Sequence, residues 1–523
     1  MSPAPPRFYN RRVFRITAYL REKARASRLG ELILWCLPAL LLGLALRIAL
    51  TSALPYAFFH DDTTDFILTA DRLLNEHKLS IHEKKSFLSP VLFTLPFLLH
   101  LPAMVAVPIA HHLMGLGMLL LTGALCRLWL ARWKLFIIPV TLLTSANPSL
   151  LWYEHTLMAE THFVFCLLLV ALAGSLYAKA QTRGRFVFLC TALFLSAGTR
   201  PEGKLLFGFA SLLLVMLHFR EWRPQLPRLG IFLAVAGLAF FLSRTSQAGL
   251  LLYTSVAKFT PQELRCAPGY ESYIAPVRAA LLARSEQLPS FPRVRTRKEI
   301  SRVVNLYLDE RGNRESREAF CLRLAKETCL RSLTKLPAHT FQKFRYHCCD
   351  SPAELLDEHM IFKKQREAYM DRADLVRRLA RGLFWREIAS DDELNRFIDA
   401  SYREVAWFNA LSKKWYDIAA RWRLPDQTYR NPDFPAVPFV YHGIPLYMIA
   451  ALAGLLFAIF RSGPLLRFHI AWGVSLLLLL FVIMLTANVR ARFRFFLEPF
   501  WFLYIALLVD CLLCQFARLR RKK

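Results

Sequence analysis

The chain has 523 residues, of which 55% are hydrophobic and 41 are phenylalanine. This composition excludes an ordinary soluble domain and indicates several membrane spans. The formal net charge of +29 does not indicate nucleic-acid binding, because the basic residues fall between apolar runs and form no aromatic-interleaved patch. We assign the basic residues to membrane topology and to contact with anionic lipid head groups.

Residues 1–30 are basic and lead directly into an apolar run at 31–53. No small-residue cleavage site separates them, so we expect a cytoplasmic basic N-terminus followed by a retained first span. An exoplasmic loop at 54–100 follows this span. It contains a stretch of helical period at 63–77 and an apolar stretch at 87–99, which we expect to lie along the membrane interface.

Further apolar runs predict spans 2 to 10. They lie at 101–128, 135–152, 157–177, 186–199, 204–218, 229–247, 437–459, 467–487 and 494–515. Basic clusters follow the even-numbered spans of the first part, which is the positive-inside pattern for a cytoplasmic N-terminus. We therefore predict an all-α polytopic membrane protein with about 10 transmembrane helices.

The predicted organisation has an N-terminal transmembrane module at 31–248, which carries the loop 54–100, and C-terminal transmembrane helices with a basic tail at 436–523. The charged segment between them, 249–435, is predicted to be a mostly helical exoplasmic domain, since long loops cross membranes largely regardless of charge. The absence of an internal repeat argues against an inverted-repeat transporter. The cysteines show no paired metal spacing, and disulfides within 249–435 remain open.

This topology places several polar turns on the exoplasmic side, together with the acidic pair Asp61 and Asp62. The positive-inside bias should deplete exoplasmic turns of basic residues, yet two of these turns are rich in arginine and lysine. The candidate phosphate-binding residues are Arg200, Lys204, Arg490, Arg492 and Arg494. Arginine can clamp a phosphate with two hydrogen bonds, and a carboxylate can take the proton from an attacking hydroxyl. The arrangement suits an anionic lipid substrate.

Each of these residues also has a purely structural interpretation. Asp62 or Thr63 can cap the helix that follows, and the arginines at 490–494 can be snorkelling anchors at a helix start. Glu160 can be a partner of the helix dipole at the start of span 4. His111 and His112 are expected to be packed or hydrogen-bonded within span 2.

A metal site is the weaker interpretation of the histidines and glutamate near these turns. The set is His60, His155, Glu160 and His162. Their spacing is loose compared with known zinc motifs, so we predict no metal.

The polar turns resemble the motifs of a known enzyme family. Asp62, Phe66, Ala70, Leu73 and Leu74 resemble the first external loop of membrane glycosyltransferases that use polyprenyl-phosphate sugars. This is the GT-C fold, of the protein O-mannosyltransferase and lipid A aminoarabinose transferase type. Further resemblances to its external turns are carried by residues 147–153, 157–161, 199–203 and 492–499. The motifs occur in family order.

The first motif departs from the family pattern. The family usually has Asp-Glu or Asp-Ser with a tyrosine four residues on, whereas this chain has Asp61-Asp62-Thr63 with Phe66. The choice between Asp61 and Asp62 therefore stays open. Asp62 is favoured, because it keeps the four- and eight-residue steps to Phe66 and Ala70.

The resemblance implies an inverting glycosyltransferase in which Asp62, or else Asp61, acts as general base and the basic residues hold the donor phosphate. It places Tyr153, His155, Glu160 and Glu202 in the pocket and requires neither metal nor cofactor. The implied partners are a polyprenyl-phosphate sugar donor, a lipid, glycan or protein acceptor, and membrane lipids. The implied location is a bacterial inner membrane, with the active site facing the periplasm.

Other functions remain as alternatives. One is a lipid-linked oligosaccharide polymerase, ligase or flippase. The spans are mostly apolar at mid-depth, which argues against transport. The other is a non-enzymatic membrane scaffold in which 249–435 binds a partner. Alanine at Asp61 and Asp62 would leave the function of such a scaffold intact.

Overall fold

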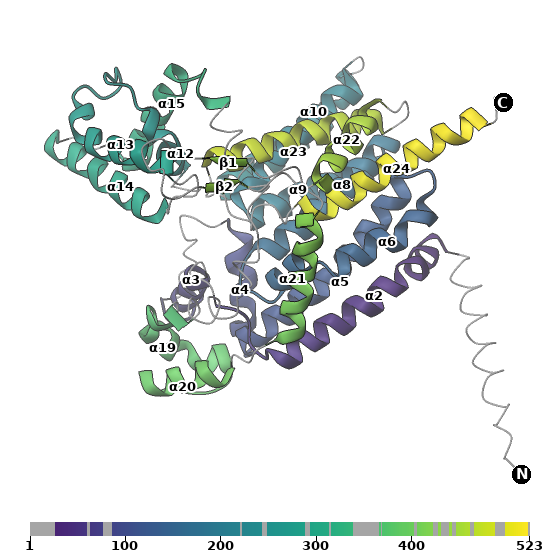
Figure 1. The fold of residues 1–523 in the computed structure, drawn as a ribbon, viewed down its shortest axis with the longest axis horizontal. Helices are drawn as coiled ribbons and strands as arrows, with labels where there is room; N and C mark the ends of the chain where they lie inside the picture. Colours follow the sequence, from purple (N-terminus) through teal and green to yellow (C-terminus); the bar gives the residue numbers. More distant parts are fainter. Residues whose placement is uncertain are drawn as a thin grey trace, which may run out of the picture.

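The computed structural model describes most of the chain. The described residues are 27–59, 63–76, 86–219, 222–242, 248–287, 293–312, 315–337, 366–367, 369–401, 405–421, 427–429, 439–441, 446–460, 465–486 and 497–520. Within them the structure is almost entirely helical (Figure 1). The described strands are β1 (Gln427–Tyr429) and β2 (Phe439–Tyr441), which pair antiparallel with Thr428 opposite Val440.

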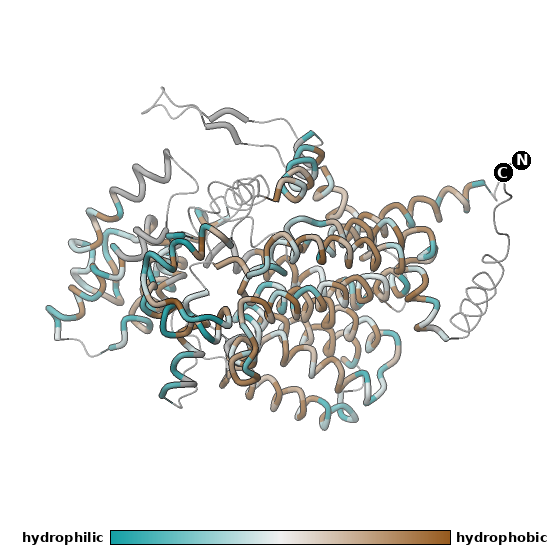
Figure 2. The backbone as a smooth tube through the Cα atoms, turned by 90° about the horizontal axis from the view of Figure 1, so that it is seen from below, coloured by the Kyte–Doolittle hydropathy of each residue, from teal (hydrophilic) through white to brown (hydrophobic). Residues whose placement is uncertain are grey.

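The apolar helices pack side by side into a bundle (Figures 1 and 2). They are α2 (Arg28–Ala53), α5 (Ala103–Trp129), α6 (Trp133–Ser145), α7 (Pro148–Glu154), α8 (Glu160–Lys179), α9 (Arg183–Thr199), α10 (Leu205–His218), α11 (Leu226–Leu242), α22 (Leu446–Phe460), α23 (Leu466–Thr486) and α24 (Glu498–Arg520). The short 3-10 turns η1 (Pro201–Lys204) and η2 (Arg223–Gln225) precede α10 and α11.

Six helices are long and apolar enough to cross a membrane, and α6 with α7 makes a seventh if the bent pair counts as one span. The chain is therefore an integral membrane protein. Every predicted span corresponds to a helix, but the count of about 10 is not confirmed. The helices α9, α22 and α23 do not meet the length and composition that define the six.

The third predicted span, 135–152, is broken in the structure. Helices α6 and α7 meet at an angle of 53°. The side chain of Asn147 accepts hydrogen bonds from the backbone N–H groups of Ser149 and Leu150, and Pro148 occupies the first helical position. A residue before proline is driven out of helical conformation, and asparagine is a strong N-cap, so the Asn147-Pro148 pair ends one helix and starts another.

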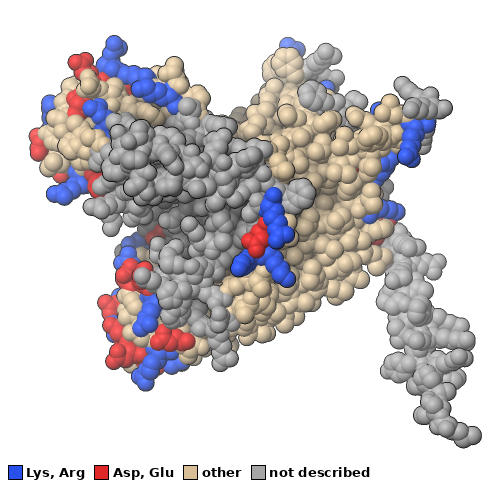
Figure 3. Space-filling view, viewed as in Figure 1, with Lys and Arg blue, Asp and Glu red and all other residues tan. Residues whose placement is uncertain are grey.

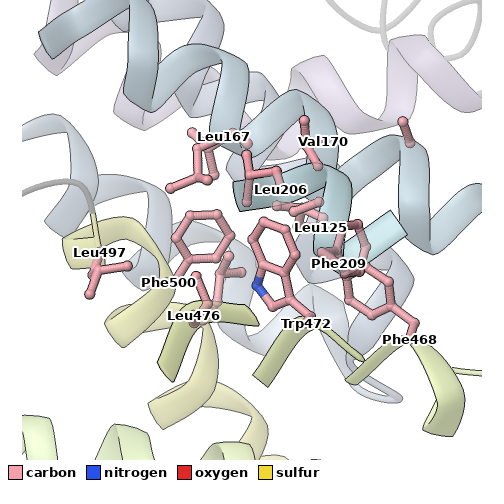
Figure 4. Packing of buried hydrophobic residues seen from close by; sticks show 14 of the residues in the cluster. Leu125, Leu167, Val170, Leu206, Phe209, Phe468, Trp472, Leu476, Leu497 and Phe500 are labelled. Atoms are coloured by element: carbon pink, nitrogen blue, oxygen red, sulfur yellow. The ribbon is translucent and has the colours of Figure 1, made fainter. Parts of the chain in front are cut away.

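The core of the bundle is built from aromatic and aliphatic side chains of α5, α8, α10, α23 and α24 (Figure 4). Trp472 of α23 is fully buried at its centre, edge-on to Phe209 at 4.9 Å between ring centroids and 5.4 Å from the ring of Phe500. Leucines on the outer side of α2, such as Leu41 and Leu44, remain exposed. In a membrane these side chains face lipid.

The helices outside the bundle form two separate groups. One group consists of α12 (Ala248–Val256), α13 (Tyr270–Gln287), α14 (Arg293–Glu310) and α15 (Arg317–Arg331), with η3 (Ala257–Phe259) between the first two. Its own core includes Tyr253, Tyr270, Tyr307 and Phe320. The predicted domain 249–435 therefore contains at least one unit with an independent core, although its boundaries stay a prediction.

The other group joins the first loop of the chain. Helices α3 (Thr63–Glu76), α4 (Leu88–Leu98), α19 (Ala373–Phe384) and α20 (Asp391–Ser401) share one hydrophobic cluster. They cover the end of the bundle at which α2 and α7 finish and α5, α8 and α24 begin (Figure 1). We call this end the site end. A last helix, α21 (Ala406–Arg421), packs beside it against α2 and α7.

The opposite end of the bundle has its own polar contacts. Asp510, in the middle of α24, accepts hydrogen bonds from the backbone N–H groups of Ala131 and Arg132, at 2.7 and 3.3 Å. Glu31 at the start of α2 pairs with Arg127 and Lys134, at 3.3 and 3.0 Å. These contacts fix the α5–α6 turn to the first and last helices of the bundle.

Close helix packing makes Gly454 of α22 a sensitive position. A Cβ atom there would lie 1.9 Å from the backbone oxygen of Tyr504 in α24. We expect Gly454→Ala to destabilise the protein by about 1–3 kcal/mol, because α22 and α24 must separate. Gly208 in α10 has nothing within 4 Å of such a Cβ, so Gly208→Ala is the matched control and should be neutral or stabilising by up to about 1 kcal/mol. Thermal unfolding in detergent measures both, and equal midpoints would contradict the close contact.

Candidate functional site

The loop that follows α2 is joined to the turn between α7 and α8 by backbone hydrogen bonds. The N–H of Phe58 donates to the carbonyl of His155 at 2.8 Å, and the N–H of Leu157 donates to the carbonyl of Phe58 at 3.3 Å. The hydroxyl of Thr63 donates to the carbonyl of Leu157 at 3.2 Å. The loop is therefore fixed to this turn on both sides of positions 60–62.

A buried chain of polar side chains lies beneath this turn. Arg47 Nη2 donates to Glu154 Oε1 at 2.6 Å, and Glu154 Oε2 lies 3.0 Å from His112 Nδ1. His112 Nε2 lies 3.2 Å from His155 Nδ1, and His155 Nε2 lies 3.1 Å from the carbonyl oxygen of Tyr56. The chain thus connects α2, α5 and α7 to the backbone that leads into the first loop.

The environment of His155 determines which of its ring nitrogens carries the proton. The carbonyl of Tyr56 only accepts, so His155 Nε2 carries a proton. Burial lowers the pKa of His155 to about 3, with a smaller contribution from His112, so His155 is neutral and its Nδ1 accepts from His112 Nε2. The other ring nitrogen of His112 contacts the carboxylate that pairs with Arg47.

Helix α5 makes room for this ion pair with a glycine. A Cβ atom on Gly115 would lie 2.2 Å from Glu154 Oε1 and 2.5 Å from Arg47 Nη2. The side chains of Glu154 and Arg47 are only 0% and 3% exposed. A buried charge is costly unless it is paired and hydrogen-bonded, so the pair depends on this close approach of α5.

A second charged group lies at the turn between α9 and α10. Arg200 Nη1 donates to Glu160 at 2.6 Å, while its Nε and Nη2 donate to the two oxygens of Glu202 at 3.2 and 3.1 Å. Burial lowers the pKa of Arg200, but Glu202 and Glu160 outweigh burial, and the net effect raises its pKa. One guanidinium thus lies between two carboxylates. Lys204 follows one turn later, 5.7 Å from the ring of Phe240.

Two more contacts bring the remaining motifs to the same end of the bundle. Asn147 donates its side-chain N–H to the carboxylate of Glu498, the first residue of α24. Ser89 of α4 donates its hydroxyl to the carbonyl of Thr199 at 2.8 Å. The loop after α2, the α6–α8 turns, the α9–α10 turn and the start of α24 therefore meet at the site end.

The histidines of α5 take different roles. His112 is hydrogen-bonded in the chain described above, whereas His111 packs against His162 and Phe93, with ring centroids 4.6 and 6.0 Å away. This agrees with the prediction that both are packed or hydrogen-bonded. Within the described part of the chain, no group of three or more His, Cys, Asp or Glu side chains is placed to hold a metal ion. His60 lies outside that part.

The predicted site residues divide into two sets. Those outside the described residues are Asp61, Asp62, Arg490, Arg492 and Arg494. Of the others, Arg200, Glu160 and Glu202 form one cluster, and His155 belongs to the buried chain. Tyr153 is buried in the core of the bundle.

Sequence reasoning missed Arg47 and did not count Glu154 as a site residue. Arg47 stands inside the first apolar run, and an ionisable residue within a span is itself a signal of a specific role. Its partner Glu154 is 107 positions away in the sequence, and no spacing rule relates the two.

Comparison with known proteins does not assign the chain to a family. No family model matches the sequence, and no curated protein matches it. Among solved structures, the chain is similar to the crystal structure of ArnT from Cupriavidus metallidurans bound to undecaprenyl phosphate. The two are 12% identical, with 88% of this chain and 78% of that chain covered at a TM-score of 0.32. A TM-score this low does not establish a shared fold.

Removing the carboxylate of the buried chain should be strongly destabilising. In Glu154→Gln, Arg47 loses its counter-charge inside the bundle, which costs about 3–5 kcal/mol. Glu31→Gln is the matched control, because its pairs with Arg127 and Lys134 are partly exposed and worth about 0–1 kcal/mol. Thermal unfolding of the purified protein compares the two. A double variant, Arg47→Met with Glu154→Gln, should recover part of the loss, and its failure to do so would argue against the pair.

The buried His155 predicts a pH dependence of stability. Its pKa is about 3 in the folded protein and 6.5 when unperturbed, so the neutral ring contributes fully above pH 6.5, and this contribution is lost as the pH falls from 6.5 towards 3. We expect the thermal midpoint to fall more steeply below pH 6.5 in the wild type than in His155→Asn. Parallel midpoint-against-pH curves for the two proteins would contradict the burial of an uncharged His155.

Proposed function

We propose that this protein is a membrane glycosyltransferase that takes a sugar from a polyprenyl-phosphate donor at the site end. The observation that carries the proposal is the meeting of the sequence motifs there. Thr63 contacts Leu157, Arg200 contacts Glu160, and Asn147 contacts Glu498. Segments that resemble the external turns of one enzyme family are brought together by side-chain contacts from distant parts of the chain.

The proposed general base is Asp62, with Asp61 as the alternative. Thr63, which follows Asp62 in the sequence, donates its hydroxyl to the carbonyl of Leu157, three residues before Glu160. A carboxylate in this loop would take the proton from the acceptor hydroxyl as it attacks the sugar carbon. The bond from sugar to phosphate breaks, the lipid phosphate leaves as an anion, and the sugar is transferred with inversion.

The leaving phosphate needs cations, and the structure changes which residues we propose for this role. Arg200 donates hydrogen bonds to Glu160 and Glu202, so we assign it to holding the α9–α10 turn in place. Lys204, Arg490, Arg492 and Arg494 are the proposed phosphate ligands. Such cations act in a site of low dielectric, where they stabilise a developing anion more strongly than in water.

The polyprenyl chain requires an apolar surface beside the site. Helix α4 exposes Val91, Leu95 and Leu98, which are spaced along one side of the helix. We propose that the donor lipid lies along this side, where each buried methylene contributes about 0.8 kcal/mol. The site end would face the outside of a bacterial inner membrane.

Asp62→Asn tests the proposed base. We expect sugar transfer to fall by at least about 100-fold, since a positioned general base contributes about 10²–10⁴ to the rate. The matched control is Asp71→Asn in α3, where the half-buried Asp71 pairs with the exposed Arg378 at 3.2 Å and transfer should be unchanged. The assay follows a radiolabelled sugar from a panel of polyprenyl-phosphate donors in membranes that contain the protein. As a control for an intact site, the purified Asp62→Asn protein should bind polyprenyl phosphate as well as the wild type does. Full transfer by both Asp62→Asn and Asp61→Asn would overturn the proposed base.

A further inference from the structure

Helix α21 crosses the bundle near its site end. Phe408 and Val405 share a hydrophobic cluster with Leu50 and Leu54, at the end of α2. Seven residues after Phe408, Trp415 meets the ring of Phe502 edge-on at 6.1 Å between centroids, near the start of α24. A helix whose successive turns contact different spans lies across them, as Figure 1 shows for α21. It therefore crosses the spans and does not run parallel to them.

The depth of α21 matches the head-group region. Leu50 is three residues before the end of α2, and Phe502 is four residues after the start of α24. At about 1.5 Å per residue, these contacts lie about 5–6 Å inside the helix ends. Helices that lie in a membrane interface bury their apolar side by about 5–10 Å.

The two sides of α21 differ in the way that interfacial helices require. Phe408 and Ser412 are buried, and Leu411 and Trp415 are half-buried on the same side. The exposed side carries Lys413, Lys414, Asp417 and Arg421. In Figure 3 a small group of basic and acidic side chains lies on the face that carries α21, beside the uncharged surface of the bundle.

We propose that the exposed side of α21 binds the head groups of anionic phospholipids in the leaflet at the site end. Lys413, Lys414 and Arg421 outnumber Asp417, which gives the surface a net positive charge. Ile418, an exposed apolar side chain of α21 itself, would contact the acyl chains. Lipid rather than a protein partner is the fitting occupant, because the basic residues adjoin a lipid-facing surface. The proposal is independent of the glycosyltransferase function.

Photo-crosslinking with lipid probes tests this surface locally. The full-length protein is reconstituted with photo-crosslinking phosphatidylglycerol or with the corresponding phosphatidylcholine, and crosslinks on the α21 peptide are counted by mass spectrometry. Each basic residue near a membrane surface is worth about a fivefold preference for anionic lipid. We expect the phosphatidylglycerol probe to be favoured several-fold on α21, and the preference to decrease at high salt.

Charge reversal provides the decisive comparison. The triple variant K413E/K414E/R421E should lose the preference on α21. The control variant R302E/K326E/K335E makes the same change of charge at exposed positions in α14, in α15 and just after α15. It should keep the preference for phosphatidylglycerol on α21. If the first variant does not fold, K413Q/K414Q/R421Q replaces it and should show a reduced preference. An equal yield of both probes in the wild type, or a preference that survives substitution, would overturn the proposal.

Discussion

The site end depends on one buried ion pair, between Arg47 of α2 and Glu154 of α7. Neither charge can be kept inside the bundle alone, so each fixes the other across 107 positions of sequence. The consequences spread outward from the pair. Gly115 allows α5 to approach the ion pair closely. His112 contacts the second oxygen of the Glu154 carboxylate, and His155 contacts both His112 and the backbone carbonyl of Tyr56. The first loop is thereby tied to the interior of the bundle.

Two groups of paired charges stabilise the turns of the site end. One is the chain of Arg47, Glu154 and His112, and the other is Arg200 with Glu160 and Glu202. Both groups combine residues from separate helices, and both hold turns that carry sequence motifs. These turns are therefore fixed by ion pairs as well as by apolar packing.

Much of the bundle could be predicted from the sequence, because apolar runs of span length and the basic clusters between them follow directly from membrane physics. The turns between α7 and α8 and between α9 and α10 lie where the apolar runs end, and they carry Glu160, Glu202 and His155, whereas the turn at 488–494 lies outside the described residues. The side chains with which these residues interact were not predicted. Arg200 was expected to meet a phosphate, but no periodicity indicates that two carboxylates already surround it. The bend at Asn147 was missed, although the Asn-Pro pair is a sufficient local signal.

Packing outside the membrane was the least predictable feature. The segment after residue 249 reads as uniform charged helices, yet α12–α15 form their own core, while α19 and α20 pack on the first loop. Composition cannot distinguish these cases, because an amphipathic helix does not specify which apolar surface covers it.

The return of α19 and α20 to the first loop has a functional implication. Phe59 stacks on Tyr369 at 4.2 Å, and Tyr56 meets Phe384 and Phe397 at 5.5 and 5.2 Å between ring centroids. The loop is thus held from below by the buried polar chain and from above by aromatic side chains more than 300 positions later in the sequence. In the glycosyltransferase that we propose, a lipid donor would approach from the side of the bundle, where the surface is apolar. The acceptor would then reach the loop past α19 and α20, and we propose that these two helices select it.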